Sequence, residues 1–208
     1  MADQDQRLHF PATARNREPI ADVLQHWLPN WGTILEIASG SGEHAVAFQK
    51  RFPHLRWQAS DPEPQHRNSI NAWIRHTEQS STMPHALDID VAQRPWPLPK
   101  DVEPFISAIV CINLLHISSR ACTEAVLQQA AERLPAKAPL MIYGPFKQDG
   151  VHTSLSNASF DANLRERNLE WGVRDIEWIK SLIKTLPLTL MECKSMPANN
   201  KMLILIHE

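Results

Sequence analysis

The chain has 208 residues, 43% hydrophobic and 21% charged, which suits one compact domain spanning residues 1–208. Its formal net charge of −2 argues against a broad basic face for nucleic acid, and no apolar run approaches the roughly 20 residues that cross a bilayer. Residues 1–7 are polar and lead into no apolar signal segment. We therefore expect a cytoplasmic protein with neither a nucleic-acid nor a membrane partner, and the sequence does not indicate its oligomeric state.

The three cysteines, Cys111, Cys122 and Cys193, are far apart and form no C-x-x-C pair. An odd and scattered set of this kind favours neither a disulfide framework nor a zinc site. We expect buried, reduced thiols and no bound metal.

Hydrophobic periodicity predicts helices and strands that alternate along the chain. The predicted helices cover residues 16–28 with Pro19 in the first turn, 43–51, 65–79, 118–134 with Ser118 or Ser119 as its cap, 157–168, and 175–186 with Asp175 as its cap. The predicted strands cover residues 33–38, 55–59, 86–89, 105–115, 140–143, 188–193 and 202–207, and residues 94–104, with four prolines, form a surface loop.

This alternation is typical of an α/β fold with a mostly parallel sheet. The last two predicted strands are joined by only about eight residues, 194–201. A parallel crossover needs about a dozen or more, so these two strands should be antiparallel neighbours. We therefore predict a Rossmann-like fold: a seven-stranded, mostly parallel sheet with the last strand antiparallel and helices on both faces.

A glycine-bearing turn, Ala38-Ser39-Gly40-Ser41-Gly42, follows the first predicted strand. Glycines in such a turn allow positive φ and the close approach of a ligand. With Glu36, the segment resembles motif I of the class I S-adenosylmethionine-dependent methyltransferases, where the turn passes beneath the cofactor. Ala38 replaces the usual first glycine, and we expect its methyl group to fit because the strand is still extended there. Gly40-x-Gly42-x-x-Ala45 also fits a nicotinamide or flavin fingerprint.

Acidic residues at the ends of the second and third predicted strands favour the methyltransferase interpretation. Asp61 ends the second predicted strand and could accept ribose hydroxyls in either kind of enzyme, whereas the resemblance implies that Asp88 meets the adenine amino group and the Ile89 N–H meets its ring. A cationic sulfonium tolerates these carboxylates, while a pyrophosphate would be repelled. The alternative interpretation of both aspartates is a turn-forming role, although their positions at strand ends favour the cofactor site. The residues expected to hold S-adenosylmethionine are Glu36, Ala38, Gly40, Gly42, Asp61, Asp88, Ile89 and Asn113.

The chain also resembles a narrower group, the methyltransferase-like 26 family of small proteins. The matching segments are Ala14-Arg15-Asn16-x-x-Pro19-Ile20, Leu35 to His44, Leu115-His116-Ile117-Ser118, Tyr143-Gly144-Pro145-Phe146, Ser156-Asn157-x-x-Phe160-Asp161, Trp171-Gly172-x-Arg174-Asp175 and Met196-Pro197-Ala198-Asn199-Asn200. This resemblance implies the Rossmann-like methyltransferase fold and the cofactor, and leaves the methyl acceptor unassigned.

The acceptor should bind where parallel strands end. His116 and Tyr143 lie at such ends, and we predict that they are catalytic, with His116 as a candidate base or a core residue. The predicted region 147–175 would cap this edge, whereas residues 1–15 form an N-terminal segment. The candidate acceptor-binding residues are Asn157, Trp171, Arg174, Asn199 and Asn200, although Trp171 could belong to the core and the asparagines to a turn. The absence of an Asn-Pro-Pro-aromatic signature after Asn113 favours a small-molecule acceptor over nucleic acid or a protein amide.

Two rival functions remain open from the sequence. The first is a nicotinamide-dependent oxidoreductase, for which Tyr143 and Lys147 have the Tyr-x-x-x-Lys spacing, although Gly144-Pro145 between them precludes an ordinary helix. The second is a partner protein that binds the cofactor but has lost catalysis.

Overall fold

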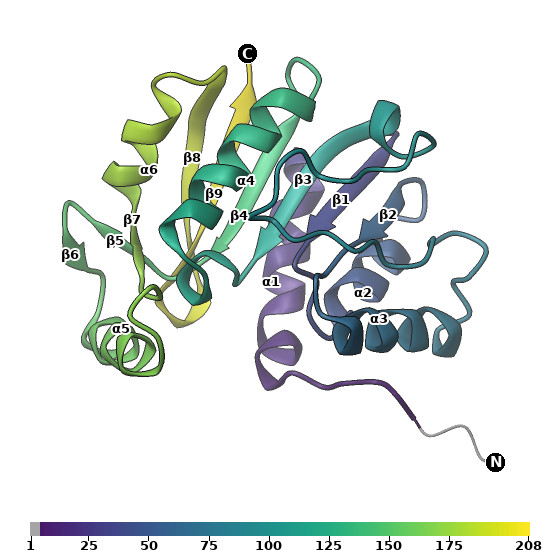
Figure 1. The fold of residues 1–208 in the computed structure, drawn as a ribbon, viewed down its shortest axis with the longest axis horizontal. Helices are drawn as coiled ribbons and strands as arrows, with labels where there is room; N and C mark the ends of the chain where they lie inside the picture. Colours follow the sequence, from purple (N-terminus) through teal and green to yellow (C-terminus); the bar gives the residue numbers. More distant parts are fainter. Residues whose placement is uncertain (1–4) are drawn as a thin grey trace. The chain divides into compact units, whose positions relative to one another are not determined.

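The computed structural model describes residues 5–208 (Figure 1). Internal contacts divide the chain into two compact units. Unit 1 contains the residues up to Asp90 and Trp96–Val110, and unit 2 contains Val91–Pro95 and Cys111–Glu208.

Unit 1 contains a pair of parallel strands and most of a third strand, with helices packed beside them. The register pairs Thr33 with Arg56 and Glu36 with Ala59, which aligns the carboxyl ends of the two strands. Every residue of the first strand is buried, as expected for an apolar parallel strand. In chain order, the elements of unit 1 are α1 (Pro11–Trp27), β1 (Thr33–Ile37), α2 (Glu43–Arg51), β2 (Arg56–Ala59), α3 (Pro64–His76), η1 (Glu103–Phe105) and β3 (Ile106–Ile112), which continues into unit 2.

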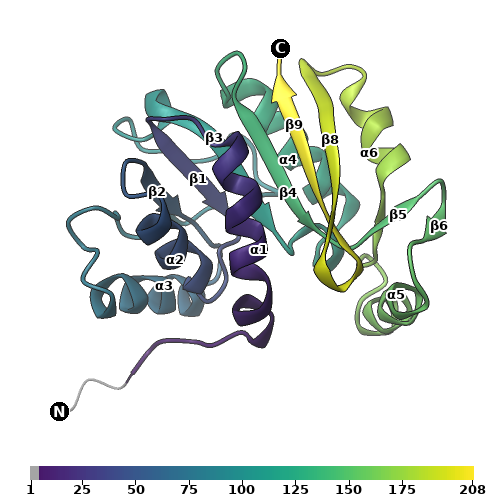
Figure 2. The same cartoon turned by 180° about the vertical axis from the view of Figure 1, so that it is seen from behind.

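Helix α1 (Figure 2) begins earlier than residue 16. Pro11 occupies its first turn, so the prediction that Pro19 does so is wrong: Pro19 lies inside the helix. An internal proline removes one backbone hydrogen bond to the residue four positions earlier, Arg15. Arg15 is exposed, so water can satisfy the carbonyl that Pro19 leaves unpaired.

The sheet has six strands, in the hydrogen-bonded order β2-β1-β3-β4-β9-β8, and not the predicted seven. The missing strand is 86–89, which forms only one isolated parallel bridge, between Ser60 and Leu87. Pairing stops there because Pro62, just beyond the bridge, has no N–H to continue the ladder. The α/β class is confirmed, whereas the strand count is corrected.

Unit 2 contains the hairpin that ends the chain. Strand β9 pairs antiparallel with both β4 and β8, so the predicted antiparallel neighbours are confirmed. The region 144–175 also forms a small sheet, in the order β6-β5-β7, that the sequence did not predict. The elements of unit 2 that follow β3 are η2 (Leu115–Ile117), α4 (Arg120–Arg133), β4 (Pro139–Gly144), β5 (Phe146–Gln148), β6 (Val151–His152), α5 (Leu155–Arg167), β7 (Arg174–Asp175), α6 (Ile176–Ile183), β8 (Leu188–Met196), η3 (Pro197–Asn199) and β9 (Asn200–His207).

Side-chain caps fix where the helices of unit 2 begin. Ser119 accepts a hydrogen bond from the Cys122 N–H at α4, and Asp175 accepts one from the Glu177 N–H at α6, as the sequence predicted. Ser154 caps α5 in the same way. Such caps satisfy backbone donors that a helix leaves unpaired at its first turn.

Within residues 5–208, no helix combines the length and apolarity needed to span a membrane.

Cys111 is buried, whereas Cys193 is exposed, so the expectation of uniformly buried thiols is wrong for Cys193. Cys193 is exposed because it lies on β8, which pairs only with β9 in the sheet order and has largely exposed side chains.

Replacing Gly42 by alanine should destabilise the protein strongly. Gly42 has φ 89°, and a Cβ there would lie 2.7 Å from the Ile70 Cα. We expect a loss of about 3 kcal/mol or more in the free energy of unfolding, measured by urea denaturation, because strain and a backbone clash combine. Gly150 has φ 77°, and a Cβ there would meet nothing within 4 Å. Gly150→Ala is the matched control, with an expected loss of about 1–2 kcal/mol from strain alone. Equal losses would contradict the close packing of Gly42 on α3.

Candidate functional site

The turn between β1 and α2 is held in a left-handed conformation at three positions. Ala38, Gly40 and Gly42 have φ values of 53°, 57° and 89°. The expectation that the strand is still extended at Ala38 is therefore wrong: the alanine tolerates a backbone region that usually favours glycine. Gly42 is also the N-cap of α2, so the turn leads directly into a helix N-terminus.

Asp61, just beyond β2, fastens this turn to the start of α3. The Gly40 N–H donates to Asp61 Oδ2 at 2.9 Å, and the Glu63 N–H donates to Oδ1 at 3.0 Å. The ring Nδ1 of His66 lies 3.0 Å from Oδ1, in position to donate a third hydrogen bond. Asp61 is only 4% exposed. A carboxylate offers about four lone-pair sites, so the protein already uses most of the acceptor capacity of Asp61.

Glu36 lies inside the core rather than beside a solvent-facing turn. The side chain is 1% exposed, and its Oε2 accepts a hydrogen bond from the Trp57 indole at 2.8 Å. Burial raises the pKa of Glu36 to about 7, although hydrogen bonds from Trp57 and Ser39 oppose the rise and the charge of Asp61 adds to it. The carboxyl group therefore titrates near neutral pH.

Asp88 and Ile89 follow the isolated bridge, but their side chains differ in environment. Ile89 is fully buried, while the Asp88 side chain is 68% exposed and its Oδ2 lies 3.0 Å from Arg67 Nη2. Arg67 Nη1 also donates to the Asp61 carbonyl at 2.9 Å. Arg67 thus ties together the two segments that were predicted to end beside the adenine and the ribose, a link that the sequence did not indicate.

His116, in η2 of unit 2, is buried among neighbours from three segments. Its ring stacks edge-on against Phe160 of α5 at 5.5 Å, and its Nδ1 lies 3.4 Å from the position of a Cβ built on Gly144. Its carbonyl accepts from the Gly172 N–H at 3.0 Å. Burial, followed by the charge of Arg174, lowers the pKa of His116 to about 4. The imidazole is therefore neutral at pH 7.

The Arg174 guanidinium donates hydrogen bonds to three backbone carbonyls. Its Nε donates to the Leu115 carbonyl at 3.1 Å, and its Nη2 donates to the carbonyls of Ser118 and Glu170. Arg174 is buried, and burial lowers its pKa, with repulsion from Arg120 and Arg165 adding to the effect. Trp171, predicted beside it, is half-buried with the Arg167 guanidinium over its ring at 5.2 Å.

The structure brings the predicted asparagines of unit 2 together. Asn157 Nδ2 donates to the Asn199 carbonyl at 2.9 Å and to Thr153 Oγ1 at 3.0 Å. Asn199, with φ 58°, is exposed in the β8–β9 connection, and Asn200 Nδ2 donates to the Pro197 carbonyl at 3.2 Å. These contacts tie α5 to the hairpin, so both donors of the Asn157 amide already serve the fold.

Two strand ends carry the remaining predicted residues. Asn113, with φ 57°, follows β3 and its N–H donates to the Tyr143 carbonyl at 2.9 Å. Tyr143 is buried in β4, and Lys147 lies in β5, where its Nζ is 3.0 Å from Asp161 Oδ2. Tyr143 and Lys147 therefore do not share a helix, which removes the helical Tyr-x-x-x-Lys pair that the oxidoreductase reading would use.

Sequence reasoning missed a buried ionic cluster around Asp161 in unit 2. The Asp161 carboxylate lies within 3.3 Å of Lys147, His152 and Arg165 and accepts the Val173 N–H at 2.6 Å. Burial alone would raise the pKa of Asp161, but the Lys147 and Val173 hydrogen bonds outweigh it and lower the pKa. A lone aspartate inside a helix gives no sequence signal of such a cluster.

A buried pair in unit 1 was also missed. Asn16 Oδ1 lies 2.8 Å from His44 Nε2, which joins α1 to α2. Burial and then the charge of Arg17 lower the pKa of His44 to about 4. Both residues belong to segments that carry the family resemblance, and their roles here are structural.

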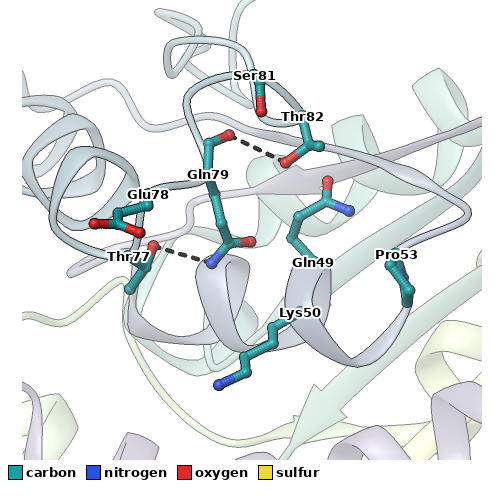
Figure 3. A pocket seen from close by; sticks show the side chains of 8 residues that line it. All are labelled: Gln49, Lys50, Pro53, Thr77, Glu78, Gln79, Ser81 and Thr82. Atoms are coloured by element: carbon teal, nitrogen blue, oxygen red, sulfur yellow. Dashed lines mark hydrogen bonds between the residues drawn. The ribbon is translucent and has the colours of Figure 1, made fainter.

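A surface pocket of about 480 Å³ lies at the other end of unit 1 (Figure 3). It is lined by the end of α2 and by the segment after α3, including Gln49, Lys50, Thr77 and Gln79. The glycine turn and Asp61 lie at the starts of those helices instead. This pocket is therefore separate from the residues predicted to hold a cofactor.

The titration of Glu36 should make stability depend on pH. The native pKa of about 7 exceeds the ordinary value of 4.5, so the native state holds the proton more tightly than the unfolded chain does. The stabilisation is complete below pH 4.5 and should fall by about 3 kcal/mol as pH rises to 7 and above. Urea denaturation at pH 5 and pH 8 measures this loss. In Glu36→Gln the loss should disappear, while Glu18→Gln, at a 74% exposed side chain, should retain it. A wild-type loss that persists in Glu36→Gln would place the titrating group elsewhere.

Solved methyltransferases share this fold. An O-methyltransferase family protein from Burkholderia thailandensis matches with a TM-score of 0.75 and 17% identity over 95% of this chain and 57% of its own. The family 2 O-methyltransferase from Planctomyces limnophilus, solved with apigenin, gives 0.76 and 20% over 95% and 58%. Human N-acetylserotonin methyltransferase, solved with S-adenosylmethionine, gives 0.74 and 12% over 94% and 52%. The chain spans a little over half the length of these proteins, and at these identities the likeness shows the fold alone.

One protein family covers almost the whole sequence. Residues 7–207 match the family described as "protein of unknown function (DUF938)". The chain therefore belongs to the DUF938 family.

Proposed function

We propose that this protein is an S-adenosylmethionine-dependent methyltransferase that acts on a small-molecule acceptor. The observation that carries the proposal is the bond from the Gly40 N–H to Asp61, which holds a buried carboxylate against a left-handed turn at the ends of two parallel strands. Ligands of open α/β sheets bind at such strand ends. The resemblance to the methyltransferase-like 26 family supports the same reading.

The residues of unit 1 fit the chemistry of this cofactor. Asp61 would accept from the ribose hydroxyls. Of its three present donors, His66 is the only side chain, so His66 is the donor that a hydroxyl can most readily replace. Asp88 would meet the adenine amino group only by sharing its carboxylate with Arg67. The proposed cofactor set of unit 1 is Glu36, Ala38, Gly40, Gly42, Asp61, Asp88 and Ile89, with Glu36 lying beneath the turn. Asn113, the remaining predicted cofactor residue, belongs to unit 2.

The acceptor would be handled by unit 2. When bound, the cofactor supplies a methyl group activated for in-line displacement. His116 is neutral at pH 7 and could take a proton from an acceptor hydroxyl, with Tyr143 beside the end of β4 as a second candidate. The region 147–175 would close over the acceptor. Because Asn157 and Arg174 are committed to backbone carbonyls, we assign them to shaping this region, together with Trp171, Asn199 and Asn200.

The solved relatives support a small acceptor rather than a macromolecule. The Planctomyces limnophilus enzyme was solved with apigenin, and another methyltransferase of the same fold was solved with S-adenosylmethionine and a hydroxynaphthoic acid. The oxidoreductase alternative is weakened by the placement of Tyr143 and Lys147 on separate strands. An inactive cofactor-binding protein would keep Glu36, Asp61 and Asp88 yet offer no open pocket at His116 and Asn157.

S-adenosylhomocysteine should raise the melting temperature of the protein, and NADH should not. A ligand that binds only the native state stabilises it by about 2.7 kcal/mol at a hundred times its Kd. For a chain of this size that corresponds to a shift of about 5–10 °C. Differential scanning fluorimetry with both ligands in parallel measures the shift. Stabilisation by NADH alone would overturn the methyltransferase proposal.

A variant of Asp61 tests the carboxylate itself. Asp61→Asn should weaken S-adenosylhomocysteine binding at least about tenfold in calorimetry, because charge-assisted hydrogen bonds to the ribose are lost. The variant should also melt earlier without ligand, since the amide cannot replace every acceptor that Asp61 offers. Asp101→Asn, at a 73% exposed side chain, is the control for charge alone. A destabilised Asp61→Asn with unchanged affinity would make Asp61 a turn residue only.

A further inference from the structure

Residues 5–10, here called the N-terminal strap, run alongside helix α3 of unit 1 and contact the first residue of α2 (Figures 1 and 2). Backbone groups anchor the strap at three points. The Leu8 N–H donates to Ser69 Oγ at 2.8 Å, and the Leu8 carbonyl accepts from the Trp73 indole at 3.0 Å. The Phe10 N–H donates to Glu43 Oε2 at 2.8 Å. The strap therefore has a defined path even though it has no regular secondary structure.

Side chains of the strap add to this anchoring. The Arg7 guanidinium lies over the Trp73 ring at 4.9 Å, and the His9 ring meets the same indole edge-on at 5.1 Å. His9 Nδ1 also lies 3.4 Å from Glu43 Oε1. Trp73 and Glu43 thus each hold the strap through more than one contact, so the position of Phe10 is set by the folded helices.

The Phe10 ring packs against the glycine turn at Gly40. A Cβ built on Gly40 would lie 2.9 Å from Phe10 Cε2, so the absence of a side chain at Gly40 is what lets the ring approach. The ring also meets His66 edge-on at 5.7 Å, and His66 is the side chain bonded to Asp61. Phe10 nevertheless remains 40% exposed. A partly exposed aromatic face therefore lies next to both the turn and the aspartate.

We propose that Phe10 is a cofactor-contact residue whose ring packs against the nucleoside portion of S-adenosylmethionine. The inference rests on the proposed function. Aromatic rings stack on nucleobases irrespective of base identity. A ring already held in place by the strap loses little conformational entropy when a ligand arrives. The proximity of Phe10 to His66 and Asp61 assigns it to the ribose and adenine side of the cofactor rather than to the amino-acid side.

The test compares two phenylalanines of unit 1. Phe10→Ala removes the proposed contact, while Phe105→Ala removes a 54% exposed ring in η1, away from the strap and the turn. Calorimetry measures the binding of S-adenosylhomocysteine and of 5′-methylthioadenosine, which keeps the nucleoside and the sulfur but lacks the amino-acid portion. We expect Phe10→Ala to weaken both ligands by about tenfold or more and by a similar factor. Phe105→Ala should bind both ligands as the wild type does.

A second variant reports on the strap without removing the ring. Trp73→Phe deletes the indole N–H that holds the Leu8 carbonyl but keeps an aromatic ring under Arg7. It should weaken both ligands less than Phe10→Ala does, because the ring is still present but less firmly placed. Melting curves of the unliganded variants establish that each is folded. If Phe10→Ala does not fold, Phe10→Leu replaces it, and a loss of affinity intermediate between wild type and tenfold supports the proposal.

The outcomes separate this inference from the function on which it rests. If the wild type binds S-adenosylhomocysteine and Phe10→Ala binds it equally well, Phe10 is no contact residue while the proposed function stands. Tighter binding by Phe10→Ala would mean that the strap obstructs the turn, which also overturns the inference. Loss of S-adenosylhomocysteine but not of 5′-methylthioadenosine would move the contact to the amino-acid side. If the wild type binds neither ligand, the proposed function itself fails and the inference with it.

Discussion

The hydrogen bonds that converge on Asp61 are the constraint on which the rest of unit 1 depends. One carboxylate accepts from the turn after β1 and from the start of α3, so it fixes two segments that are about 20 residues apart in the chain. Once this link is made, Gly42 is pressed against Ile70 and the Gly40 face is left open to Phe10. The hydrogen bonds of Asp61 therefore shape the turn and place α3, and they leave space beside Gly40 for the Phe10 ring.

Local patterns predicted most elements because local chemistry decides them. The apolar run before Ile112 and the caps at Ser119 and Asp175 were sufficient to place β3, α4 and α6. The antiparallel end of the sheet followed from a connection too short for a crossover. The strand predicted at 86–89 did not form because β2 ends at Ala59 and only one bridge, between Ser60 and Leu87, follows it. The apolar pattern of 86–89 could not show this, since pairing depends on a distant segment.

The candidate site was predictable as a set of positions but not as a set of partners. Sequence placed Asp61 and the glycine turn in one region, yet gave no sign that His66, Arg67 and Phe10 would surround them. His66 and Arg67 lie in the first turn of α3, and Phe10 precedes α1. No rule of sequence spacing predicts that side chains from such separate segments will meet. In unit 2, Asn157 and Asn199 do meet, but through an amide and a backbone carbonyl. The residue types alone did not specify which atoms make this contact.

Polar residues that look functional in the sequence divide into two groups once their hydrogen bonds are known. Asn157 and Arg174 donate to backbone carbonyls, and Asp161 binds the Val173 N–H and three basic side chains, so these residues explain why the 147–175 region keeps a defined shape. His116 differs, because it is buried against the Phe160 ring and Gly144, and burial, followed by the charge of Arg174, lowers its pKa and keeps it neutral. A neutral imidazole costs little to bury and retains an acceptor nitrogen. Chemistry that needs a proton acceptor in unit 2 is therefore better assigned to His116 than to the residues that hold its surroundings in place.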